Sequence, residues 1–132
     1  KKEGVQAYQK IEQVWFPGVH TNIGGGYVDA GLSDIAFLWM KAKAEECGLK
    51  YNVEYCDRKI NPDSFGELRN SRKLLYRLFG KFDRPILQDE NANEFIHLSA
   101  LDRLNEITIS YSPENLNNII QKERDEIGRF LY

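Results

Sequence analysis

The sequence predicts an α/β fold with one or two strands and a mostly helical remainder. An uncharged run of β-branched and aromatic residues begins at Val14 and stops at Pro17-Gly18, which is typical of a strand buried on both faces. The strand is predicted over Ile11 to Phe16. A loop rich in glycine follows the run, and a helix whose first half is apolar comes next. Such a helix can cover one face of the sheet, so these features form one β-loop-α unit.

The length and charge of the chain limit what it can be. Its 132 residues suffice for one domain and are too few for two. Eighteen basic and twenty acidic side chains give a net charge of −2, which predicts no attraction to nucleic acid. No apolar stretch approaches the roughly 20 residues that cross a bilayer, and the chain starts without a signal peptide or an initiator Met. We therefore expect a cytoplasmic chain without a transmembrane segment, taken from a longer protein.

The two cysteines predict neither a disulfide framework nor a metal site. Cys47 and Cys56 are too few for a framework, and neither belongs to a Cys-x-x-Cys or Cys/His ligand spacing. We expect both to be reduced thiols, with a short-range disulfide between them as the alternative. No cofactor and no metal are expected.

The clearest helix is predicted over Asp34 to Cys47. Ser33 is a suitable N-cap, Asp34 places a negative charge in the first turn, and Gly48 is a natural left-handed stop. The residues from Ile35 to Met40 are apolar on every side of the helix, so this half is expected to be deeply buried.

The middle of the chain gives weaker signals. Leu49 to Tyr55 alternates as a short strand would, and Asn61 to Ser64 predicts a turn. Leu68 to Phe79 has the periodicity of an amphipathic helix. Basic residues in and after this helix predict either a solvated face or a site for a phosphate head group or a partner; they are Arg69, Arg72, Lys73, Arg77, Lys81 and Arg84.

The last third is predicted to be mostly helical. Phe82 to Phe95 reads as a surface loop. A short helix is predicted over His97 to Leu104, because Ser99 and Asp102 have capping-box spacing. Pro113 suits the first position of a final helix, and apolar residues line one of its faces: Leu116, Ile119, Ile120, Ile127, Phe130 and Leu131.

His20 is the first candidate for chemistry, because it follows the predicted strand on the loop that leaves its carboxyl end. Ligands and catalytic groups of open α/β sheets gather at that end. The imidazole could act as the general base of a nucleophile-His-acid triad, in which histidine is the last member along an α/β hydrolase chain and precedes a helix. The alternative is a structural histidine that is hydrogen-bonded to a backbone carbonyl.

The residues around His20 allow further interpretations. Gly24, Gly25 and Gly26 could present N–H groups to an anion or admit a substrate, and they equally permit a tight chain reversal. Their spacing is not that of a nucleotide-binding loop. Polar residues near His20 in sequence do not make a metal site without a second histidine at helical spacing; they are Asn22, Asp29 and Asp34. His97 is expected to be a turn residue that satisfies a backbone group, with support of the site as its alternative role.

Several sequence blocks resemble one family. The blocks run from Val14 through His20 to Tyr27, then Gly31 to Ala36 with Trp39-Met40, and further on Gly66-Glu67-Leu68 with Ser71, Arg84-Pro85-Ile86, His97, Ser99, Arg103, Tyr111, Pro113, Asn115 and Leu116. They resemble, in order, the C-terminal part of an α/β-hydrolase family that is labelled as a domain of unknown function. That family includes phospholipase effectors of bacterial type VI secretion.

The resemblance implies the C-terminal fragment of a serine esterase or phospholipase, with His20 as the triad histidine. Asn22 stands where the family usually has an acidic residue. The chain has no Gly-x-Ser-x-Gly, and the nucleophile and acid of the family precede this region, so the chain alone should be inactive. Asn22, Asp34 and His97 would hold the catalytic group in place without contacting the substrate. The glycines, Gly24, Gly25 and Gly26, would form the substrate or oxyanion loop. An effector could also leave the cell by a signal-independent route.

The expected organisation is one partial domain over residues 1–132, with strand, histidine loop and helix in 1–50 and helical cover in 51–132. Its expected partners are the remainder of the parent hydrolase domain, an ester or phospholipid substrate and, through the unpaired edge of the strand, further copies of the chain. Two alternatives remain: a binding or interaction module with hydrolase ancestry, and a small self-contained helical protein.

Overall fold

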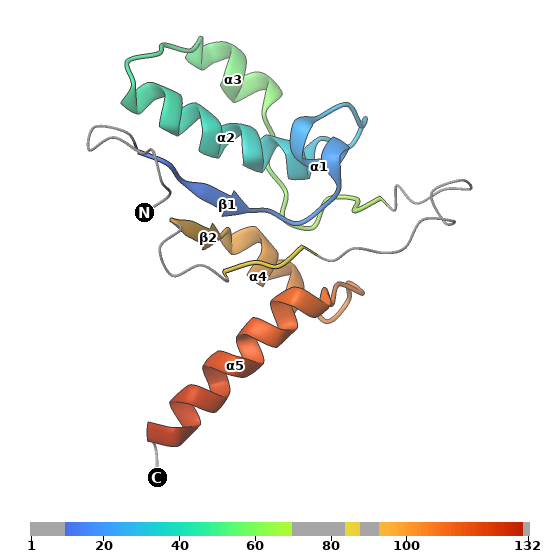
Figure 1. Ribbon diagram of the computed structural model, residues 1–132. Helices are drawn as coiled ribbons and strands as arrows, with labels where there is room; N and C mark the ends of the chain where they lie inside the picture. The colour runs from blue at the N-terminus through green and yellow to red at the C-terminus, as the bar shows by residue number, and fades with distance from the viewer. Residues whose placement is uncertain (1–9, 70–83, 88–92, 131–132) are drawn as a thin grey trace.

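The computed structural model describes residues 10–69, 84–87 and 93–130, and it has a mixed α/β architecture. Two short parallel strands lie between two groups of helices, with α1, α2 and α3 on one side of the strand pair and α4 and α5 on the other (Figure 1). The elements run in the order β1 (Gln13–Trp15), α1 (His20–Gly24), α2 (Gly31–Glu46), α3 (Val53–Lys59), β2 (Glu94–Ile96), α4 (Leu98–Asn105) and α5 (Glu114–Phe130).

The strand pair joins segments that lie far apart in the sequence. β1 and β2 are parallel, and Val14 is paired with Phe95 at the centre of the register. The backbone N–H of His97 donates to the Trp15 carbonyl at 3.0 Å, and the Trp15 indole donates to the Glu94 carboxylate at 3.2 Å. The predicted strand over Ile11 to Phe16 is therefore present but shorter. The expectation that it is buried on both faces was wrong, because within the described residues β1 has one partner strand and its side chains are exposed or half-buried.

Helix α2 confirms the strongest periodic signal but begins earlier than predicted. It starts at Gly31 rather than Asp34, and Ser33 is not its N-cap: the Ser33 hydroxyl donates to the Ala30 carbonyl at 2.9 Å. Gly31 fits this start because a Cβ there would lie 2.8 Å from the Cβ of Asp63. At the other end Gly48 adopts a φ of +88°, as predicted for a left-handed stop.

The first half of α2 is only partly buried. Leu32, Ile35 and Ala36 are buried, but Leu38 and Met40 are exposed. The apolar first half was predicted to be covered on all sides, and within the described residues one side has no cover. The cysteines near the end of this region are both free, with Cys47 exposed and Cys56 buried.

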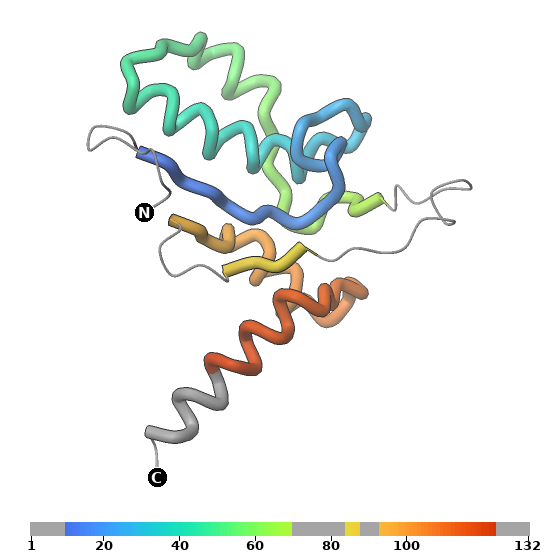
Figure 2. The backbone as a smooth tube through the Cα atoms, in the orientation of Figure 1, coloured from blue at the N-terminus to red at the C-terminus, as the bar shows by residue number. Residues whose placement is uncertain are grey.

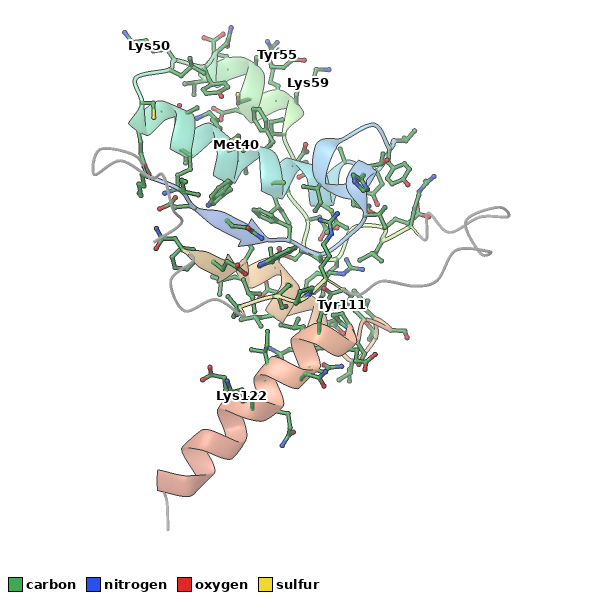
Figure 3. All side chains as sticks on the ribbon, in the orientation of Figure 1. Met40, Lys50, Tyr55, Lys59, Tyr111 and Lys122 are labelled. Atoms are coloured by element: carbon green, nitrogen blue, oxygen red, sulfur yellow. The ribbon has the colours of Figure 1, made fainter. Side chains whose placement is uncertain are left out.

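The predicted strand over Leu49 to Tyr55 was wrong, because part of this segment belongs to helix α3. The Asn52 side chain accepts a hydrogen bond from the Tyr55 N–H at 2.9 Å and so caps the helix. An asparagine cap satisfies one of the free N–H groups at a helix start, which outweighs the weak alternation of the segment. Lys50, Tyr55 and Lys59 lie at the end of the molecule away from α5 (Figure 3).

The last third has its helices as predicted and one strand that was not. Glu94 and Phe95 belong to β2, although they were assigned to a surface loop. Helix α4 is confirmed, but His97 and not Ser99 is its N-cap, because the His97 side chain accepts from the Ser99 N–H. Helix α5 is confirmed, but it begins at Glu114, so Pro113 stands just before its first residue and not at it.

A small core joins β1, β2, α4 and α5. Ile86, Ala100 and Leu116 are buried together, and partly buried apolar residues surround them: Trp15, Ile96, Leu101, Leu104, Tyr111, Ile119 and Ile120. The predicted apolar face of α5 is thus confirmed where its side chains are described. Residues 70–79 of the predicted helix over Leu68 to Phe79 lie outside the described residues, as do most of the basic stretch and Leu131. Among the helices that the structure describes, none is long and apolar enough to cross a membrane.

Candidate functional site

His20 stands just beyond the carboxyl end of β1, where the sequence predicts it. Pro17 is buried, Gly18 turns the chain with a φ of +127°, and Val19 is the extended residue before α1. His20 is the first residue of α1 rather than a loop residue, and its side chain is exposed. Within the described residues its imidazole has no hydrogen-bond partner. The alternative of a histidine held by a backbone carbonyl is therefore not what this part of the structure contains.

Asn22 fixes the start of α1 from the inside. It is 2% exposed, its Nδ2 donates to the Glu67 carbonyl at 3.0 Å, and its Oδ1 accepts a longer bond of 3.4 Å from the Val19 N–H. The helix turn that carries His20 packs against Gly18, where an added Cβ would lie 2.5 Å from the Cβ of Asn22. The amide of Asn22 thus acts as a structural clamp two residues after His20.

The glycine run ends α1 and reverses the chain. Gly24 is the last residue of the helix, and Gly25 and Gly26 have φ angles of +84° and +112° that side chains rarely adopt. A Cβ on Gly26 would lie 3.3 Å from a methyl group of Thr21, whereas a Cβ on Gly24 would meet nothing within 4 Å. The reversal accounts for Gly25 and Gly26, and the backbone at Gly24 is open to the approach of another molecule.

The segment of residues 61–69 lies beside the histidine turn, which the sequence did not predict. Figure 2 shows this segment running from α3 past the start of α2 toward α1. Asp29 holds it through its carboxylate, which accepts from the Glu67 N–H at 2.7 Å and from the Gly31 N–H at 3.1 Å. These two hydrogen bonds, the Glu67 bond first, hold the pKa of Asp29 below its usual value. The Asp63 N–H donates in turn to the Gly31 carbonyl at 3.1 Å.

Arg103 of α4 holds the same segment from the other side. It is 3% exposed, and its Nη1 donates to the carbonyls of Ser64 and Gly66, both at 2.8 Å. Its guanidinium carbon lies 5.5 Å from the centre of the Tyr111 ring, and Figure 3 shows Tyr111 near the start of α5. Burial lowers the pKa of Arg103, but a guanidinium stays charged. The sequence matched Arg103 to the family pattern without giving it a role.

The other two candidates for support of the site lie elsewhere. Asp34 is buried in the first turn of α2, and its Oδ2 accepts from the Asn61 N–H at 2.8 Å. His97 stacks on Phe16 with ring centres 4.7 Å apart and caps α4 through Nδ1. Burial lowers the pKa of His97, and Asp102 opposes this in part. In the described part of the chain neither side chain forms a hydrogen bond or a ring contact with His20.

The chain contains a pair of histidine and hydroxyl, His97 and Ser99, whose role is structural. Ser99 Oγ lies 2.9 Å from His97 Nδ1, a distance that a nucleophile and its base could have. Ser99 is only 1% exposed, however, and the same imidazole nitrogen accepts from its backbone N–H. A substrate cannot reach this hydroxyl, so the pair serves to begin α4.

His20 is the exposed candidate for proton transfer in this region. In the described residues there is no group of three or more His, Cys, Asp or Glu side chains that could hold a metal ion. The imidazole of His20 is exposed at the end of a strand, on a turn held by buried polar contacts, so a reacting molecule can reach it.

Residues 1–43 match the model of one protein family, described as the catalytic domain of Tle1-like phospholipase effectors of type VI secretion (T6SS). The matched third of the chain contains β1, His20, the glycine run and most of α2. It relates this chain to phospholipase-type hydrolases of that secretion system. No curated protein matches the chain. No solved structure matches it either.

Proposed function

We propose that this chain supplies the general base, His20, of a serine-type hydrolase of α/β-hydrolase fold that cleaves carboxylic esters of phospholipids. The observation that carries the proposal is the exposed imidazole at the end of β1, which has no hydrogen-bond partner among the described residues and lies inside the stretch that matches the phospholipase effector family. The nucleophilic serine and the triad acid are proposed to lie outside the 132 residues.

The proposed reaction needs one proton carrier, and His20 is suited to that task. As the serine oxygen attacks the ester carbonyl carbon, the imidazole takes the hydroxyl proton and later gives it to the departing alcohol oxygen. Water then attacks the acyl-enzyme, and the imidazole takes its proton and returns it to the serine oxygen. The clamp by Asn22 supports this role, because it fixes the turn that carries the ring without occupying the ring itself.

The glycine run is proposed to line the substrate path. Gly24 supports this, since its backbone has open space where a side chain would be. Gly25 and Gly26 turn the chain away directly after α1, so no bulky side chain from these positions covers the surface beside His20.

The remainder of the parent domain is the proposed partner of this chain. β1 has one partner strand among the described residues, so one edge of a strand that would be central in a hydrolase sheet is free there. Exposed apolar side chains also support a covering partner. They are Leu38 and Met40 on α2, Phe95 on β2 and Leu98 at the start of α4. A second copy of the chain could pair with the same edge.

The test uses the full-length polypeptide encoded with this chain and, in parallel, the 132 residues alone. We expect the full-length polypeptide to hydrolyse a short acyl ester and a phospholipid, and to be labelled by a fluorophosphonate at a serine outside this chain. The 132 residues alone should do neither. A folded full-length polypeptide that resists the probe and hydrolyses no ester would contradict the proposal and would favour a binding module.

A further inference from the structure

Two consecutive carbonyls, those of Gly66 and Glu67, connect α4 to the histidine turn. Arg103 Nη1 donates to the Gly66 carbonyl at 2.8 Å, and Asn22 Nδ2 donates to the next carbonyl along the chain, that of Glu67, at 3.0 Å. These two carbonyls belong to neighbouring peptide planes that are joined at the Cα of Glu67, so only the φ and ψ of that residue lie between them. The Glu67 N–H, which shares the plane of the Gly66 carbonyl, is held by Asp29. The contact of Asn22 and the contact of Arg103 are thus separated by a single residue of backbone.

The contacts around this peptide leave the segment little freedom to shift. Asp29 accepts from the Glu67 N–H, and Arg103 holds the Ser64 carbonyl as well as that of Gly66. The Ser64 hydroxyl donates to Asp102, the neighbour of Arg103 on α4, at 3.2 Å. The packing around Gly66 is tight, because a Cβ there would lie 3.2 Å from Oδ1 of Asp29.

The environment of Arg103 marks it as more than a surface cation. Its side chain is almost completely buried, and its Nε has no hydrogen-bond partner among the described residues. Burying this cation costs free energy of desolvation, which its two hydrogen bonds of 2.8 Å to backbone carbonyls offset. Buried polar contacts of this kind restrict the geometry of the segment that they hold.

We propose that Arg103 is a positioning residue for His20: it acts through the Gly66-Glu67 carbonyls and Asn22 to fix the turn of α1 on which the imidazole stands. This inference rests on the proposed function for its catalytic meaning, but the coupling itself is a property of the described contacts. Among the described residues Arg103 forms its hydrogen bonds with Ser64 and Gly66 and none with His20, and it has no contact with the substrate in the proposed reaction.

Hydrogen–deuterium exchange of the full-length polypeptide tests the coupling without reference to activity. Arg103→Met should speed exchange by about tenfold or more in peptides covering residues 61–69 and also in those covering residues 18–24, with little change in α5. Arg103→Lys keeps a buried cation that can donate to the carbonyls, and it should restore much of the protection in both regions. Arg58→Met is the matched control, because Arg58 is an exposed arginine of α3, and it should leave both regions unchanged.

The reverse perturbation keeps the test decisive if Arg103→Met does not fold. Asn22→Ala removes the bond to the Glu67 carbonyl from the other end, so exchange in residues 61–69 should also rise. The proposal is overturned if Arg103→Met affects residues 61–69 but not 18–24, if it affects all helices equally, or if Asn22→Ala leaves residues 61–69 unchanged.

Ester hydrolysis by the same variants gives the catalytic readout. Arg103→Met should lower kcat by about tenfold or more with little change in KM, and Arg103→Lys should recover most of that loss. A wild-type polypeptide that hydrolyses no ester would refute the proposed function, while the exchange data would still decide the coupling. Normal kcat in an Arg103→Met variant with a loosened turn would refute the positioning role alone.

Discussion

The substitution Asn22→Asp probes the clamp beneath His20 with the smallest change in shape. The Asn22 amide donates to the Glu67 carbonyl at 3.0 Å and is 2% exposed. An ionised aspartate in the same place has no proton to donate, and it would turn a negatively charged oxygen toward that carbonyl oxygen. The bond to the Val19 N–H could remain, because it uses an acceptor atom.

The expected cost follows from the lost donor and from the burial of charge. Leaving a buried acceptor unpaired costs about 1–3 kcal/mol, and burying a carboxylate beside a carbonyl oxygen raises its pKa at about 1.4 kcal/mol for each unit. We expect the free energy of unfolding to fall by about 2–4 kcal/mol at neutral pH. Since the folded pKa lies above the unfolded one, part of this loss should be regained as the pH falls through the folded pKa and the protonated acid donates to Glu67.

Urea unfolding, followed by tryptophan fluorescence at neutral pH and near pH 4, measures both parts of the expectation. The quantity compared is the difference between Asn22→Asp and wild type at each pH. Asn117→Asp is the matched control: its Nδ2 bond to the Ser112 hydroxyl is exposed, so its effect should stay below about 0.5 kcal/mol. An Asn22→Asp variant that is as stable as wild type at neutral pH, or whose deficit does not shrink in acid, would refute the reasoning.

Three further predictions concern other parts of the chain. Gly18→Ala should lower the free energy of unfolding by about 3 kcal/mol or more, because its φ of +127° is strained for alanine and its Cβ would overlap Asn22; urea unfolding checks this. Burial lowers the pKa of His97, so its contribution to stability is present above pH 6.5 and is lost as the pH falls through the folded pKa; His97→Asn keeps a cap acceptor and should reduce the drop in urea midpoint between about pH 7.5 and pH 5. Native alkylation followed by mass spectrometry should modify Cys47 and spare Cys56, and equal labelling would show that Cys56 is accessible.

The elements that the sequence predicted well are those with local signals. Apolar periodicity predicts helices α2 and α5, and residues at their ends such as Gly48 and Pro113 predict where they stop or start. The strand before His20 was found because its apolar run is stopped by Pro17-Gly18. Strand β2 was missed because three residues carry too short a pattern, and its partner lies about 80 positions away.

The candidate site also has a part that local sequence predicts and a part that depends on distant contacts. His20 could be picked out from its place after a strand and before glycines, both of which are close in sequence. The clamp on its turn could not, because Asn22 and Glu67 are 45 residues apart and Gly66 and Arg103 are 37 apart. Such contacts leave no periodic trace, and the spacing of Gly66 and Arg103 has no meaning until the chain is folded.

The most direct test of the central claim is the rate of ester hydrolysis by His20→Ala in the full-length polypeptide, measured with and without added imidazole. Removal of a general base should reduce kcat by a factor on the order of 10⁴ or more while the circular dichroism spectrum is unchanged. Because the side chain at position 20 is exposed, free imidazole should enter the vacated space and restore part of the rate. A folded His20→Ala variant that hydrolyses the ester at the wild-type rate would contradict the account.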